Sequence, residues 1–214
     1  MNTKYLSVAI PKGRLGDQTI KQLNAIGFSQ LNMNDSRKLI FEDDNQGVVF
    51  IAVKPIDVIT YVQSGMADIG VVGKDLILEE EANIYELFDL NIGKCSLSIA
   101  SLNHKVLNTQ LSIRIATKYP NLTKKHFENK QKEVEIIPLN GSVELGPIVG
   151  LSDVIVDIVE TGETLKANGL HVIEKIHDVS ARLISNKASY RFKYKQIKSL
   201  LSLLEKRSLY DQNH

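Results

Sequence analysis

The chain of 214 residues has a single cysteine, Cys95, and no run of hydrophobic residues long enough to cross a membrane. One cysteine excludes an intrachain disulfide and fits a reducing compartment, where such bonds are rare. A membrane-spanning helix needs roughly 18 or more consecutive hydrophobic residues, so none is expected. The N-terminus lacks a basic segment followed by a hydrophobic stretch and a cleavage site. We therefore expect a soluble cytoplasmic protein.

An excess of one charge is also missing, because 26 Lys and Arg residues are balanced by 25 Asp and Glu residues. A general nucleic-acid-binding surface needs a marked basic excess, so that class of protein is not expected, although a local basic cleft is still possible. The five histidines show no pairing at metal-ligand spacing, so no metal site built from histidine is expected. Low-complexity segments, Pro/Gly/Ser-rich linkers and repeats of solenoid length are absent as well.

What the chain does contain is an alternation of short β-branched runs with helical patterns, which indicates an α/β protein. Several of the runs are hydrophobic without strict alternation, which is typical of a sheet covered by helices on both faces. The predicted strands are Tyr5–Ile10, Val48–Val53, Ala67–Val72, Ser96–Ser101, Ile113–Thr117, Val134–Pro138 and Asp153–Val159. The predicted helices are Leu15–Ile26, Ile56–Ser64, Lys74–Glu81, Leu122–Asn129, Ser142–Leu151 and Glu163–Asn168.

A last helix is predicted near the C-terminus, where Ile197, Leu200, Leu201 and Leu204 form one hydrophobic stripe. We interpret this stripe as a core-packing face in preference to a partner-binding face. Two further segments, Asp89–Cys95 and His171–Arg182, are candidates for crossovers between two lobes. Such crossovers would place residues 1–91 and 180–214 in one lobe and residues 92–179 in the other. Two lobes of this kind would enclose a central cleft, the usual place for a small-molecule site.

The most informative stretch is Asp153–Leu165, in which a hydrophobic β-branched run stops at acidic and hydroxyl residues around one glycine. This order predicts a strand, a tight loop and the start of a helix, which together direct several backbone N–H groups at one point. Thr161 and Thr164 add hydroxyl donors, and Gly162 allows close approach of the backbone. A phosphate monoester suits this arrangement.

Two carboxylates, Asp157 and Glu160, accompany the loop. Carboxylates suit ribose hydroxyls or Mg²⁺. The segment therefore predicts a site for a phosphorylated sugar.

Several further segments carry a resemblance to a known family. They are Pro11–Leu15, Asp35–Leu39, Ala67–Asp75, Cys95–Ala100, Arg114–Pro120, Leu139–Glu144 and the loop with Asn168–Leu170 after it. In this order the segments resemble the ATP phosphoribosyltransferase family, whose phosphoribosyl-pyrophosphate motif corresponds to the acidic–hydroxyl–glycine loop. The resemblance implies two α/β lobes of the periplasmic-binding-protein type II fold.

The implied reaction, the first step of histidine biosynthesis, transfers the 5-phosphoribosyl group of phosphoribosyl pyrophosphate to N1 of ATP. Mg²⁺ is implied as the cofactor, bound mainly through substrate phosphates and not through a dedicated set of protein ligands. Because the chain stops after one terminal helix, it resembles the short form of the family. That form works with a regulatory subunit related to histidyl-tRNA synthetase, in a hetero-octamer of four catalytic and four regulatory chains.

The resemblance also assigns residues. The substrate-binding residues implied are Asp157, Glu160, Thr161, Gly162, Glu163, Thr164, Leu165 and Glu144. The residues implied to stabilise the pyrophosphate or the triphosphate are Lys12, Arg14, Arg37 and Lys54. Lys54 departs from the family pattern, which usually has arginine there, so the charge is kept but the bidentate geometry is lost.

Plainer interpretations exist for most of these residues. Asp157 can be a turn carboxylate, Thr161 and Thr164 can cap a helix, and Glu144 can belong to a capping box opened by Ser142. The cations can lie on solvated loops or in surface salt bridges. For the whole chain the alternatives are a two-lobed solute-binding or sensory module, a phosphoribosyltransferase with another nucleophile, and an inactive paralogue.

Overall fold

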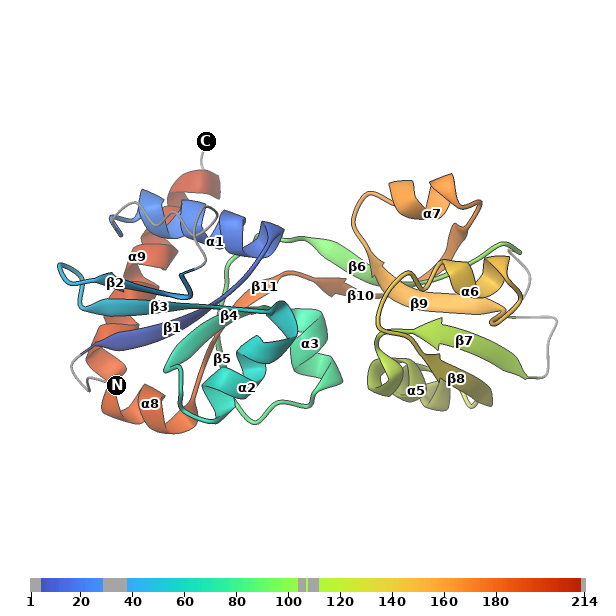
Figure 1. Ribbon diagram of the computed structural model, residues 1–214, viewed down its shortest axis with the longest axis horizontal. Helices are drawn as coiled ribbons and strands as arrows, with labels where there is room; N and C mark the ends of the chain where they lie inside the picture. The colour runs from blue at the N-terminus through green and yellow to red at the C-terminus, as the bar shows by residue number, and fades with distance from the viewer. Residues whose placement is uncertain (1–4, 29–37, 104–106, 108–111, 213–214) are drawn as a thin grey trace. The chain divides into compact units, whose positions relative to one another are not determined.

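The structure is a computed structural model, which describes residues 5–28, 38–103, 107 and 112–212. The chain divides into two compact units, each with its own mixed β-sheet (Figure 1). Unit 1 consists of Met1–Ile77, Glu81–Gly93 and Ser180–His214, and unit 2 consists of Leu78–Glu80 and Lys94–Val179. Unit 1 is thus discontinuous, because the chain leaves it to build unit 2 and then returns.

Unit 1 is built on a sheet of six strands in the order β2-β3-β1-β4-β11-β5. Its strands are β1 (Leu6–Pro11), β2 (Ile40–Asp43), β3 (Val48–Val53), β4 (Ile69–Gly73), β5 (Tyr85–Asp89) and β11 (Ala181–Ser185). Its helices are α1 (Arg14–Ala25), a 3₁₀ turn η1 (Pro55–Asp57), α2 (Val58–Gln63), α3 (Lys74–Glu79), α8 (Lys187–Phe192) and α9 (Tyr194–Gln212), of which α3 ends in unit 2. Strands β3, β1 and β4 are parallel neighbours, so their carboxyl ends meet at one edge.

Helices cover both faces of this sheet. The side chains of Ile69 and Val71 join a core cluster with α1 and α9. Gly70 lies between them and faces α2, since a Cβ on Gly70 would come within 2.8 Å of the side chains of Val58 and Val62. The predicted C-terminal stripe packs into this same core cluster, where Ile197, Leu200 and Leu204 are buried. The core-packing interpretation of that stripe is confirmed.

Unit 2 has a sheet of five strands in the order β10-β6-β9-β7-β8. Its strands are β6 (Cys95–Ser101), β7 (Ile113–Thr117), β8 (Val134–Pro138), β9 (Val154–Val159) and β10 (His171–Val179). Its helices are α5 (Pro120–Asn129), α6 (Leu145–Ile148) and α7 (Glu163–Ala167). Strands β9, β7 and β8 are parallel neighbours, whereas β6 and β10 complete the sheet in antiparallel pairing.

Most strands agree with the sequence prediction, and the misses fall mainly at sheet edges. The bounds of β3, β7 and β8 agree with the prediction residue for residue. Strands β2, β5, β10 and β11 were not predicted, and the crossover segment His171–Arg182 contains β10 and the start of β11. Strand β10 lies at the edge of its sheet, is largely exposed and carries charged residues, so it lacks a continuous hydrophobic signal.

The predicted helix Ser142–Leu151 is wrong in extent, because only the single turn α6 forms there. Pro147 contributes no N–H group, and Gly150 has a positive φ of 76° that ends the turn. Ser142 also has a positive φ of 49°, which a helical residue cannot have. None of the helices within the described ranges is both long and hydrophobic enough to cross a membrane.

Candidate functional site

Unit 1 brings three of the predicted cations together at the carboxyl ends of β1 and β3. Pro11 and Val53 are paired in register at the end of these parallel strands, and the N–H of Lys12 donates to the carbonyl of Val53 at 2.7 Å. Lys12 and Lys54 therefore leave neighbouring strands at the same level. Arg14 follows as the first residue of α1, and the side chains of all three cations are exposed. This edge is suited to bind a polyphosphate.

A glycine-rich turn fixes the cations at this edge. Gly13 has a φ of 88°, in the left-handed region, and its carbonyl accepts the first hydrogen bond of α1 from Asp17 at 3.0 Å. Gly16 allows α1 to lie directly against the end of β1, since a Cβ there would come within 1.9 Å of the Pro11 carbonyl oxygen. The role of Gly16 depends on the depth of this packing, which local sequence does not reveal.

The neighbouring strand β4 ends in a turn with a buried carboxylate. Asp75 is 7% exposed, and a Cβ on Gly73 would come within 2.1 Å of its Oδ1 atom. The carboxylate therefore folds back over Gly73. Asp75 is the second residue of α3, so it accompanies the first turn of that helix.

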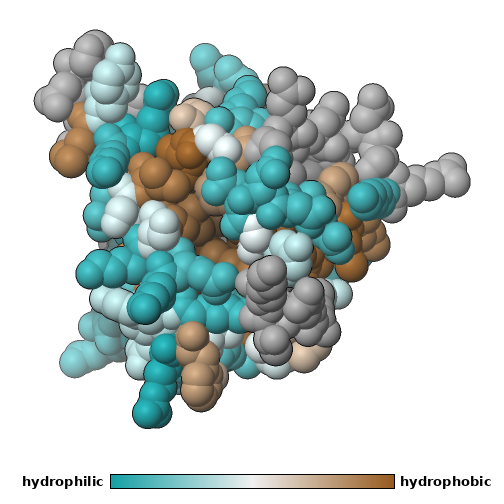
Figure 2. All heavy atoms as spheres, turned by 90° about the vertical axis from the view of Figure 1, so that its left-hand side faces the viewer, coloured by the Kyte–Doolittle hydropathy of each residue, from teal (hydrophilic) through white to brown (hydrophobic). Residues whose placement is uncertain are grey.

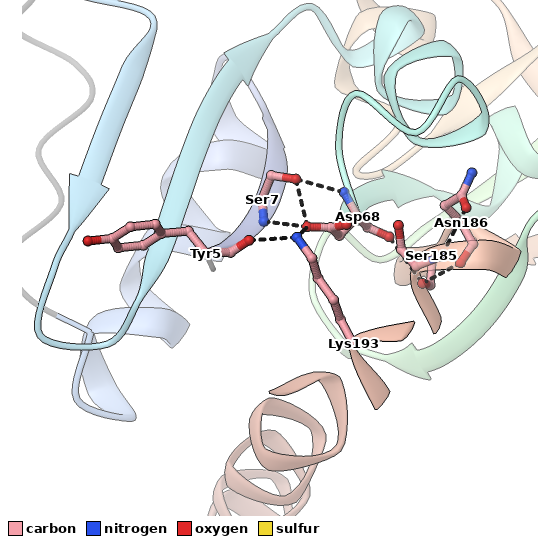
Figure 3. Close-up of polar contacts among 7 residues, drawn as sticks. Tyr5, Ser7, Asp68, Ser185, Asn186 and Lys193 are labelled. Carbon is pink, nitrogen blue, oxygen red and sulfur yellow. Dashed lines mark hydrogen bonds and ion pairs between the residues drawn. The ribbon is translucent and has the colours of Figure 1, made fainter. Parts of the chain in front are cut away.

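Asp68 lies at the opposite, amino end of β4, where its carboxylate binds the ammonium group of Lys193 (Figure 3). Its Oδ2 atom accepts hydrogen bonds from the N–H and hydroxyl of Ser7, both at 2.8 Å, and forms an ion pair with Lys193 at 2.6 Å. Burial of the carboxylate favours its neutral form, but the bonds from Lys193 and Ser7 outweigh burial and lower the pKa of Asp68. The ion pair joins the C-terminal part of unit 1 to β1 and β4.

The same cluster forms the polar wall of a groove of about 850 Å³ at the amino ends of the strands. Ile40 and Phe192 add hydrophobic residues to the lining, and Phe192 is 83% exposed. Hydrophobic residues also gather in a strip on the otherwise mostly hydrophilic face drawn in Figure 2. The groove and Asp68 therefore belong to the amino end of the sheet, whereas Lys12 and Lys54 lie at its carboxyl end.

In unit 2 the predicted phosphate loop forms a tight turn between β9 and α7. Gly162 has a φ of 75° in the left-handed region and occupies the N-cap position of α7. Its carbonyl accepts the first hydrogen bond of the helix, from Lys166 at 3.0 Å. The N–H groups of Thr164 and Leu165 precede this bond, so they are first-turn donors that have no acceptor within the helix. The turn can therefore present main-chain donors to an anion.

The side chains of this turn divide into exposed and buried groups. Thr161, Glu163 and Thr164 are exposed, and the N–H of Glu163 lies 3.4 Å from the Thr161 hydroxyl oxygen. Leu165 is 6% exposed and packs in a core cluster, so only its main chain can contact a ligand. Helix α7 has only 5 residues, and a short helix contributes a small dipole. An anion would be held mainly by N–H groups and hydroxyls.

Three more carboxylates of the prediction lie near the same edge of the sheet. Glu160 is exposed and directly follows β9. Asp157 is half-buried in β9, and its Oδ1 atom accepts the N–H of Ile158 at 2.8 Å. Glu144 is half-buried at the N-cap position of α6, where no side-chain capping bond forms. The capping box with Ser142 is therefore wrong, because the helix begins after Glu144 and not at Ser142.

The predicted residues are divided between the two units. Lys12, Arg14 and Lys54 belong to unit 1, whereas Glu144, Asp157 and the turn residues belong to unit 2. Arg37 lies outside the described residues. Within the described ranges, no three His, Cys, Asp or Glu side chains are grouped closely enough to hold a metal ion.

Comparison with known proteins gives a family and a fold. A family model described as ATP phosphoribosyltransferase matches residues 54–206. An ATP phosphoribosyltransferase from Clostridioides difficile is 52% identical over 202 residues, which is 94% of this chain and 97% of the relative. One from Caldicellulosiruptor bescii is 50% identical over 205 residues, covering 94% of this chain and 98% of the relative.

A solved structure agrees with this result. The ATP phosphoribosyl transferase (HisG:HisZ) complex from Thermotoga maritima contains a chain that superposes with a TM-score of 0.80 at 37% identity. The match covers 94% of this chain and 97% of that chain. The two-lobed α/β fold class is therefore confirmed over nearly the whole length.

Proposed function

Because this chain belongs to the ATP phosphoribosyltransferase family, we propose that it transfers the 5-phosphoribosyl group of phosphoribosyl pyrophosphate to N1 of ATP. This reaction is the first step of histidine biosynthesis. The observation that carries the proposal is the 52% identity to a relative of that name over 94% of the chain. The turn after β9, residues 160–165, is the proposed binding site of the 5-phosphate and is called the phosphate seat below.

The chemistry requires no activated nucleophile from the protein. Adenine N1 carries the electron pair that forms the bond to ribose C1, and the bond from C1 to the pyrophosphate oxygen breaks with inversion. The barrier arises from bringing two polyanions together and from the charge that develops on pyrophosphate. Positioning can lower such a barrier by as much as about 7–11 kcal/mol, and fixed cations stabilise the leaving group.

The two units contribute different groups to this task. Unit 1 offers Lys12, Arg14 and Lys54 as ligands for the pyrophosphate or the triphosphate. Unit 2 offers the N–H groups and hydroxyls around Gly162 for the 5-phosphate, and Asp157 for the ribose hydroxyls. Glu144 is a second candidate for the ribose.

Mg²⁺ is the proposed cofactor, and the donor set fits a substrate-bound ion better than a protein cage. Phosphate oxygens and water would complete its coordination, with Asp157 or Glu160 as a carboxylate ligand, since Mg²⁺ commonly takes one or two carboxylates beside substrate phosphates. When bound, the ion would neutralise charge on the leaving pyrophosphate. Arg37, outside the described residues, is kept as a further ligand of the pyrophosphate.

We further propose that the chain works with a regulatory subunit of the HisZ type, as the Thermotoga complex does. A hetero-octamer of four catalytic and four regulatory chains is the proposed assembly. The proposed location is the cytoplasm, where ATP and phosphoribosyl pyrophosphate are available.

A direct assay tests the proposal. The chain is incubated with ATP, phosphoribosyl pyrophosphate and Mg²⁺, with and without the regulatory subunit, and phosphoribosyl-ATP is followed by its ultraviolet absorbance. We expect turnover that requires both substrates. Turnover with another base in place of ATP, or none under either condition, would contradict the proposed reaction.

A further inference from the structure

The carboxyl ends of β7 and β9 mark the topological switch point of the unit 2 sheet. The chain runs from β7 through α5 to β8 on one side, and then through α6 to β9 on the other side. Ligands of parallel sheets bind where the strand order reverses, outside the carboxyl ends of the strands. Thr117 is paired with Val156 at the end of β7, so the next residues, Lys118 and Asp157, follow the last β7–β9 pair at the same level. Asp157 is still paired with Ser98 of β6.

The backbone around Lys118 is held firmly on both sides. The Thr117 hydroxyl donates to the Val156 carbonyl at 2.7 Å and accepts the N–H of Tyr119 at 2.9 Å. Thr117 and Tyr119 are buried, at 0% and 1% exposed, and the hydroxyl of Thr123 donates to the Tyr119 carbonyl at 2.6 Å. Lys118, between these anchors, is exposed. The strand end therefore presents a lysine from a fixed backbone position.

The proposed phosphate seat lacks positive charge of its own. Its donors are neutral N–H and hydroxyl groups, while Asp157, Glu160 and Glu163 place three carboxylates in the same short segment. A phosphate dianion beside carboxylates needs a cation, because like charges in proximity are destabilising. Lys166 is a weaker candidate, since it lies in the last turn of α7, whereas the anion would bind at the first turn.

The position of Lys118 meets this need. Two residues of β9, Ile158 and Val159, lie between Asp157 and the turn. They span about 7 Å at the usual rise of a strand. The flexible four-carbon stem of a lysine is suited to extend along this distance toward the turn. Among the described residues, no hydrogen bond or ion pair occupies the Lys118 ammonium group.

We propose that Lys118 is a further substrate-binding residue, which supplies the positive charge for the 5-phosphate held at the turn after β9. The inference rests on the proposed function, since it takes that turn as the phosphate seat. Lys118 was not identified as a site residue by sequence reasoning, although it directly follows a correctly predicted strand.

Equilibrium binding of two probes tests the inference. Ribose 5-phosphate carries the 5-phosphate without the pyrophosphate, and phosphoribosyl pyrophosphate carries both. We expect Lys118→Ala to weaken binding of both probes to the full chain by the same factor, about tenfold, as for loss of one charge-assisted bond. Lys118→Arg should recover most of the affinity, and the KM for ATP should stay within twofold of wild type.

Lys125→Ala is the matched control, because Lys125 is also exposed and lies one helix turn or more beyond the strand end, in α5. It should leave both affinities unchanged. If Lys118→Ala binds ribose 5-phosphate as wild type does, or loses affinity only for phosphoribosyl pyrophosphate, the assignment to the 5-phosphate is overturned. If wild type itself turns over but fails to bind ribose 5-phosphate, the inference is overturned while the proposed reaction stands.

Discussion

Units 1 and 2 both place predicted site residues where parallel strands end, but the two edges carry different groups. The edge of unit 1 presents the side chains of Lys12, Arg14 and Lys54. The edge of unit 2 presents main-chain N–H groups around Gly162, two threonine hydroxyls and several carboxylates. The same strand arrangement therefore supports a cationic surface in one unit and a nearly neutral anion seat with acidic neighbours in the other.

This difference indicates what each edge can discriminate. Flexible cations bind many polyphosphates by charge, whereas fixed N–H groups fit one phosphate in one orientation. Changes to side chains should therefore have large effects at the unit 1 edge. At the unit 2 edge the main chain should retain most of the binding when one hydroxyl is removed.

The largest expected effect comes from the backbone of unit 1. In Gly16→Ala the new Cβ would lie 1.9 Å from the Pro11 carbonyl oxygen, so α1 has to move away from β1. We expect the free energy of unfolding to fall by about 3–4 kcal/mol, as for a severe steric clash in a packed region. Denaturant-induced unfolding measures this loss.

Gly141→Ala is the control in unit 2, because a Cβ there meets nothing within 4 Å. Its free energy of unfolding should stay within about 0.5 kcal/mol of wild type. A loss of less than about 1 kcal/mol in Gly16→Ala would show that α1 is not pressed against the strand end as described.

The next effect concerns the charge at the unit 1 edge. We expect Lys54→Ala to lower kcat about 100-fold, equivalent to about 2.7 kcal/mol, because the cation acts on charge that develops as pyrophosphate leaves. The KM values should change less than kcat. Steady-state kinetics with both substrates measures the effect.

Two variants sharpen this result. Lys54→Arg keeps the charge and should keep most of kcat, while Lys21→Ala, an exposed lysine of α1, should leave the kinetics unchanged. An unaltered kcat in Lys54→Ala would remove Lys54 from the leaving-group site.

The sequence predicts strands that carry a continuous hydrophobic run, such as β3 and β7. It misses the buried strand β11, whose five residues include Arg182 and Ser185. It does not predict β5 or β10, because their charged and exposed residues hide the strand pattern. Pro147 and Gly150, in contrast, are helix-breaking residues that the sequence itself shows, and they explain why α6 is a single turn.

The candidate site follows the same division. Lys54 directly follows a predicted strand and Lys12 follows another after Pro11, so the sequence places both at a sheet edge. Only the pairing of β1 with β3 shows that they are neighbours. The role of Gly16 has no sequence signal, because it depends on the distance between α1 and the end of β1. Long-range packing of this kind is set by the fold and not by local sequence.

The smallest expected effect comes from a single hydroxyl at the unit 2 edge. Thr161→Ala removes one donor from the proposed phosphate seat but leaves the main-chain N–H groups in place, so we expect the KM for phosphoribosyl pyrophosphate to rise about fivefold, near 1 kcal/mol. The KM for ATP should stay within twofold, and Thr161→Ser, which keeps the hydroxyl, should resemble wild type. Equal increases in both KM values would count against the turn as the seat of the 5-phosphate. A loss as large as that of Lys54→Ala would show that the threonine side chain, and not the main chain, dominates binding at this edge.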